Sequence, residues 1–241
     1  MYWLADFAAA AAYWTEALAI DEALGDVAGT AERHYNLGFT AMISGDFPAQ
    51  RAHHQAVLEL YESIGDEVGV INTQEGLVPA LLRAGDLAGG EELLVHTVAA
   101  QRARGHLVRV SEDLSLLSTF QALAGHLDRA RASVLEALPL ADQAGTLTSV
   151  TSALASVAQI ETSAGRPERG ATIAGALATM TESAQVAITQ VAMLGLPPAA
   201  DEARARMAPE AFDRAYAAGR TMDRAAIIAY ALDGLRMPAG A

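Results

Sequence analysis

The chain contains no cysteine and no lysine, and only 5% of its 241 residues are aromatic. The absence of cysteine excludes disulfides and thiolate metal sites, and it is typical of proteins in a reducing cytoplasm. All sixteen positive charges are arginines, so the lysine-containing phosphate loop of nucleotide hydrolases is excluded too. No apolar run approaches the about 18 residues of a membrane-spanning helix. We therefore expect a cytoplasmic protein with no membrane partner and no phosphate loop.

The net charge of −13 is concentrated in the first part of the chain. Residues 1–100 contain fifteen acidic residues and three arginines, whereas the last forty-one contain six of each sign. Proteins that bind nucleic acid directly do so mainly through Lys and Arg contacts to phosphates, and this chain has no basic stripe. We expect no direct nucleic-acid partner. The acidity favours a cationic partner or, more simply, an ordinary solvated surface.

Turn residues recur every forty residues in two series, which indicates a repeated helical hairpin. One series is Gly25, Gly65, Gly105 and Gly145; the other includes Gly45-Asp46-Phe47 and Gly85-Asp86-Leu87. Glycine ends a helix in the left-handed conformation, and a following Asp caps the next helix. The spacing predicts helices at residues 6–23, 27–43, 47–63, 67–83, 87–103, 107–123, 127–143, 147–163 and 167–183.

Apolar columns in register with the turns support an α-solenoid in which each hairpin buries its apolar face against its neighbours. Leu37, Leu77, Leu117 and Val157 form one such column. The pattern changes after about residue 184, and Pro197-Pro198 stops the helical sequence before three shorter helices near residues 199–207, 209–218 and 222–235. We therefore expect an all-α protein, with a solenoid over residues 1–184 and a helical cap over residues 185–241.

Leu37-Gly38, followed by Gly45-Asp46-Phe47 and Leu58, resembles the tetratricopeptide repeat, although this unit is longer and lacks the closing proline. Residues 207–220 and 223–232 resemble the C-terminal signature of actinobacterial LuxR/AfsR-type transcriptional regulators of the signal-transduction ATPase class. In those regulators an ATPase precedes a tetratricopeptide-like solenoid, and a DNA-binding helix-turn-helix lies at one chain end. The resemblance implies that this chain is a fragment, or a truncated descendant, of such a regulator.

No residue set points to catalysis, a cofactor or a metal. His53 and His54 are adjacent and point about 100° apart on a helix, so they do not share a metal readily. We expect His54 to fill a core or half-buried position and the other four histidines to be dispersed. The paired carboxylates lie on helix surfaces or at first turns, where the helix dipole favours them. The sequence therefore predicts a protein that is not an enzyme and has no cofactor.

Two candidate binding surfaces remain. In tetratricopeptide-like arrays the first helix of each pair lines the concave face, which predicts a groove for a protein or peptide; a merely solvated face is an equal alternative. Its residues are Glu32, Tyr35, Phe39, Asn72, Glu75, Glu112, Ser115 and Thr119. The N-terminal end is the second candidate, for self-association or for an upstream ATPase domain, through Trp3, Phe7 and Trp14.

The expected function is therefore a non-catalytic protein- or peptide-binding scaffold. The resemblance makes it the sensory or interaction part, at the C-terminal side, of a bacterial transcriptional regulator. The alternative is a stand-alone adaptor or peptide-sensing repeat protein with no attached reader.

Overall fold

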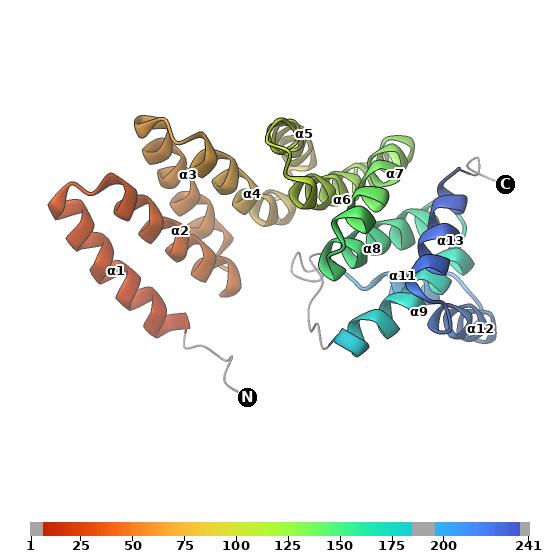
Figure 1. Cartoon of the computed structure of the whole chain (residues 1–241). Coiled ribbons are helices and arrows are strands. Elements are labelled where there is room, and N and C mark those ends of the chain that lie inside the picture. Colours follow the sequence, from red (N-terminus) through yellow and green to blue (C-terminus); the bar gives the residue numbers. More distant parts are fainter. Residues whose placement is uncertain (1–6, 185–195, 237–241) are drawn as a thin grey trace. The chain divides into compact units, whose positions relative to one another are not determined.

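The computed structural model describes residues 7–184 and 196–236, and the fold over these residues is all-α (Figure 1). They form twelve helices and no strand. The helices are α1 (Phe7–Leu24), α2 (Val27–Ile43), α3 (Phe47–Ile64), α4 (Glu67–Arg83), α5 (Leu87–Ala103), α6 (Leu107–Leu123), α7 (Leu127–Ala144), α8 (Leu147–Ser163), α9 (Pro167–Ala184), α11 (Ala199–Ala205), α12 (Pro209–Arg220) and α13 (Arg224–Arg236).

The predicted helical repeat is confirmed, and each of the nine helices expected before residue 184 begins and ends within one residue of its prediction. Eight glycines spaced twenty residues apart, from Gly25 to Gly165, have φ between 68° and 82°. This left-handed conformation reverses the chain after each helix and is costly for residues that carry a Cβ atom. The glycine ladder therefore sets the helix ends.

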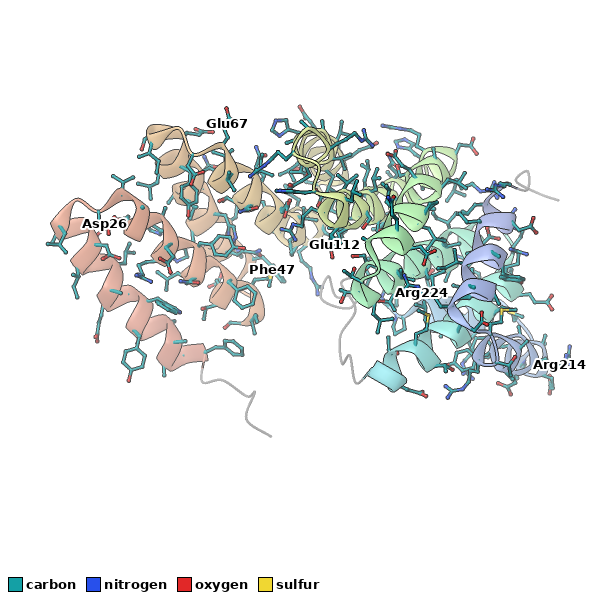
Figure 2. The ribbon with its side chains drawn as sticks, viewed as in Figure 1. Asp26, Phe47, Glu67, Glu112, Arg214 and Arg224 are labelled. Atoms are coloured by element: carbon teal, nitrogen blue, oxygen red, sulfur yellow. The ribbon has the colours of Figure 1, made fainter. Side chains whose placement is uncertain are left out.

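The residue after each glycine lies at the capping position of the next helix, and the type of residue at this position differs along the chain. Thr146 at the start of α8 accepts from the N–H of Ser149 at 3.4 Å. Among the described helix starts, His106 and His126 lie at the capping position of α6 and α7 without making this bond. In the first four turns the capping residue is an aspartate whose carboxylate accepts from the N–H three residues later. These residues are Asp26, Asp46, Asp66 and Asp86, and Asp26 is labelled in Figure 2.

The chain divides into two compact units, residues 1–93 and residues 94–241, so the division falls within α5. In the first unit α1 packs on α2, α2 on α3, and α3 on α4, and α2 also contacts α4. Its buried apolar residues are Ala31, Leu37, Val57, Ile71, Val78 and Ala80. The first unit therefore has a small core, because each of its helices buries only part of its surface.

In the second unit the hairpins continue, and the C-terminal helices close over them. α6 packs on α7 and α8, α8 on α9, and α11, α12 and α13 contact the repeat helices α7 to α9. A Cβ atom on Gly219 of α12 would collide with the backbone oxygen of Thr172 on α9, so these helices approach through glycine. The C-terminal helices α11, α12 and α13 thus lie in one compact unit with the last repeats.

A buried carboxylate organises the contact between α8, α9 and α13. Glu161 on α8 is fully buried and lies 2.6 Å from Arg166 and 3.3 Å from Arg169. The Arg169 guanidinium also lies 4.0 Å from the ring centre of Tyr230 on α13 and donates to the Tyr230 carbonyl. Because a buried charge is costly unless it is paired, this network fixes α9 and α13 to α8.

Candidate functional site on the first unit

The first unit contains a cluster of histidines that centres on His54 of α3. The His54 ring is buried, and its Nδ1 lies 2.9 Å from the carbonyl oxygen of Gln50. The ring fits between α2 and α4 because both helices have glycine beside it. A Cβ atom on Gly38 would lie 2.5 Å from Nδ1, and one on Gly76 would collide with Nε2. The expectation that His54 fills the core is confirmed.

Gln50, one turn before His54, is also fully buried and ties α3 to α4. Its Nε2 donates to the carbonyl oxygen of Gly76 at 2.8 Å, while its Oε1 has no hydrogen-bond partner among the described residues. The core of the first unit therefore contains the polar side chains of Gln50 and His54 beside its apolar residues. Such a core is less favourable to bury, because an unpaired polar atom loses its bond to water.

His34 and His53 come together across the α2–α3 contact, which corrects the expectation that His34 is isolated. Their Nδ1 atoms are 2.9 Å apart and their ring centres 5.2 Å apart. The difference between these two distances, 2.3 Å, is about the sum of the two ring radii. Both nitrogens therefore lie nearly on the line that joins the ring centres. One ring donates the Nδ1–H and the other accepts, so the pair shares a single proton.

This geometry fits a proton and does not fit a metal ion. An ion midway between the two nitrogens would be closer to each than the about 2.0 Å of a metal–imidazole bond. Within the described ranges no group of three or more His, Asp or Glu side chains is arranged to hold a metal. Burial lowers the pKa of His34 and His53, and the His34 charge lowers the pKa of His53 further. Burial also lowers the pKa of His54. Both effects favour the neutral rings.

Five of the predicted groove residues lie on α2 and α4, and we call them the α2–α4 strip: Glu32, Tyr35, Phe39, Asn72 and Glu75. They occupy equivalent repeat positions on two helices in contact. Glu32, Phe39 and Asn72 are exposed, whereas Tyr35 and Glu75 are half-buried. The Tyr35 ring lies 5.5 Å from the His54 ring, so the strip continues inward to the histidine cluster.

Sequence reasoning missed two exposed apolar residues on the same helices. Ile43 follows Phe39 by one turn on α2, and Val68 lies one turn before Asn72 on α4. The signal was their spacing of four residues from predicted members of the strip. Phe39, Ile43 and Val68 together give this surface an apolar component larger than the sequence predicted.

Three predicted groove residues lie on α6 of the second unit. Ser115 and Thr119 are buried, which corrects their assignment to an open surface. Ser115 donates to the carbonyl oxygen of Ser111, and the Thr119 hydroxyl lies 3.2 Å from that of Ser156 on α8. Thr119 therefore joins α6 to α8 inside the second unit, whereas the Ser115 bond lies within α6. Glu112, labelled in Figure 2, is half-buried and accepts from Ser149 of α8 at 3.1 Å.

The N-terminal end also differs from the prediction. Trp3 lies outside the described residues, and Phe7 is half-buried. Trp14 is half-buried beneath the Arg33 guanidinium of α2, which lies 5.4 Å from its ring centre. Trp14 thus packs within the first unit. The large apolar side chains that α1 exposes are Tyr13, Ile20 and Leu24.

None of the described helices is both long enough and apolar enough to span a bilayer. No protein-family model matches the chain, and no curated protein matches it. The chain is similar to the crystal structure of BtubC (BKLC) from P. vanneervenii, with a TM-score of 0.65 and 16% sequence identity. The match covers 97% of this chain and 94% of that one. At this identity the similarity shows a common helical-repeat fold and nothing further.

Proposed function

We propose that this chain is a non-catalytic scaffold that binds a protein or peptide segment through the α2–α4 strip. One observation carries the proposal: the Phe39 side chain is 42% exposed on α2, a helix that contacts α4. An exposed aromatic side chain can anchor an interface, because truncating one such anchor often removes most of the binding energy.

The chemistry of the strip favours a segment with one apolar anchor and several hydrogen-bond donors. Glu32 offers carboxylate oxygens, and the Asn72 amide both donates and accepts. The fifteen acidic residues among residues 1–100 favour a cationic segment over an acidic one. A peptide that places an apolar side chain on Phe39 and an Arg or Lys near Glu32 would satisfy both features.

A peptide-display selection against the whole chain tests this proposal. Peptides that bind the wild-type chain are expected to bind Phe39→Ala at least tenfold more weakly, a loss of about 1.4 kcal/mol. Ile64→Ala is the matched control, because Ile64 is 49% exposed on α3 of the same unit. Equal binding to the wild-type chain and to Phe39→Ala would refute the strip as the binding surface.

For the biological setting, we propose the sensory or interaction part of an actinobacterial transcriptional regulator that acts in the cytoplasm. The support is the resemblance of the repeats and of residues 207–232 to LuxR/AfsR-type regulators. A bound segment would favour one packing of the helices and so bias an attached ATPase or DNA reader. The alternative is a stand-alone adaptor. An ATPase coding region in frame upstream of Met1 would favour the regulator, and its absence would favour the adaptor.

A further inference from the structure

α1 exposes a line of large apolar side chains. Tyr13, Ile20 and Leu24 are 71%, 58% and 75% exposed. Their spacing of seven and four residues places them on one line along the helix, which we call the α1 line. Figure 1 shows α1 at the edge of the first unit, beside α2. Three neighbouring apolar side chains so exposed on one helix are typical of an interaction surface.

The repeat itself shows what kind of element fits the α1 line. Forty residues after Tyr13 lies His53, whose Nδ1 contacts His34 on the preceding helix α2. A further eighty residues on, Ser133 of α7 donates to Gln121 on the preceding helix α6 at 2.8 Å. At His53 and Ser133, therefore, the repeat position of Tyr13 faces the helix that precedes its own helix in the chain. The element that fits the α1 line at Tyr13 is thus another α-helix, whereas Ile64, the equivalent of Leu24, is exposed.

The charges around the α1 line indicate which net charge the partner helix should have. α1 contains Glu16, Asp21 and Glu22 and no basic residue. Arg33 neutralises Asp21 at 3.1 Å, and Glu22, nine residues after Tyr13, lies on the opposite face of the helix. Glu16, four residues before Ile20, is exposed beside the line. A second copy of α1 would bring the two Glu16 carboxylates to the same interface, and like charges across an interface are costly. A helix with Lys or Arg beside its apolar face would instead pair with Glu16.

We propose that the α1 line is a docking site for an amphipathic, basic helix of a partner protein. The line extends over about three turns, roughly 16 Å, which sets the length of the partner helix. The site uses none of the residues of the α2–α4 strip. It adds a second surface to the proposed binding role, and either surface can fail in an experiment without the other.

The test uses two synthetic peptides of about 18 residues, long enough to form a helix on binding. Both have Leu along one face; the opposite face has Lys in one and Glu in the other. Binding to the whole chain is followed by fluorescence anisotropy. The variants are Ile20→Ser with Leu24→Ser, and the control is Ile64→Ser. Ile64 is the repeat equivalent of Leu24 and is also exposed.

The Lys peptide is expected to bind the wild-type chain and Ile64→Ser equally, and the double variant at least tenfold more weakly. The Glu peptide should bind at least tenfold more weakly than the Lys peptide. Equal Lys-peptide binding to all three proteins would mean general attraction to an acidic surface and would overturn the proposal. Concentration-dependent dimerisation that Ile20→Ser and Leu24→Ser abolish would overturn it too, because a second copy would then be the occupant. Phe39→Ala, measured with the same peptides, should have no effect.

Discussion

Replacing Gly38 by alanine should destabilise the first unit, whereas the same replacement at Gly89 should stabilise it. The Cβ atom added at Gly38 would lie 2.5 Å from His54 Nδ1. The ring has no room to retreat, because it is buried and Gly76 of α4 lies against it. At Gly89 the added atom meets only the Asp86 carboxylate. The repeat equivalent there is Ala49, whose N–H is capped in the same way.

The expected change in the free energy of unfolding for Gly38→Ala is the balance of opposing effects. Replacing Gly by Ala inside a helix stabilises by up to about 1 kcal/mol. Overpacking a buried site costs about 1–3 kcal/mol, and displacing the His54 ring also loses its bond to Gln50, about 1 kcal/mol. We therefore expect Gly38→Ala to lower the free energy of unfolding by about 2 kcal/mol. For a unit of this size that corresponds to a fall in Tm of about 10 °C.

Tryptophan fluorescence is the appropriate assay. Trp14 packs beside Arg33 within the first unit, so its emission follows the unfolding of that unit. Urea titrations of the wild-type chain, Gly38→Ala and Gly89→Ala give the free energies to compare.

A second background isolates the contact itself. Valine, which stands at the equivalent position 134, is smaller than histidine and leaves room for a Cβ atom at position 38. In a His54→Val background, Gly38→Ala should therefore be neutral or stabilising, with a coupling energy of about 2 kcal/mol. The reasoning is refuted if Gly38→Ala stabilises the wild-type chain, or if its effect is the same in both backgrounds.

Three further outcomes are expected. Burial lowers the pKa of His34, His53 and His54, so the unfolded chain takes up protons before the folded chain as the pH falls. The free energy of unfolding should therefore be highest above about pH 6.5 and fall below it. Urea titrations at several pH values should show this fall, with a smaller dependence on pH for His53→Leu. Glu161→Gln should cost about 3–5 kcal/mol, because it leaves Arg166 without its buried counter-charge, and a second unit no less stable than wild type in circular dichroism would contradict this. The chain should show no sequence-selective DNA binding in gel-shift titrations, and binding in the nanomolar range would show that an acidic chain without lysine can still read DNA.

The sequence alone determined the helices, because their ends depend on local chemistry. The left-handed glycine and the capping Asp act within a few residues of themselves, so forty-residue spacing was enough to locate both ends of nine helices. The burial of His54 followed in the same way, since its column contains Leu94 and Val134. The α2 and α4 members of the strip could be named because their helices repeat one pattern.

Tertiary structure decided which side chains meet and which reach solvent. Ser115 and Thr119 have the repeat positions of Tyr35 and Phe39, yet they are buried because α6 packs closely on α8 through small hydroxyl side chains. Trp14 and Tyr13 are adjacent, and only the rotation of α1 against α2 determines that Trp14 packs on Arg33 while Tyr13 is exposed. His34 and His53 are nineteen residues apart, and it is the crossing of α2 and α3 that brings their nitrogens within 2.9 Å. Such contacts depend on the rotation and separation of whole helices, which the repeat spacing does not specify.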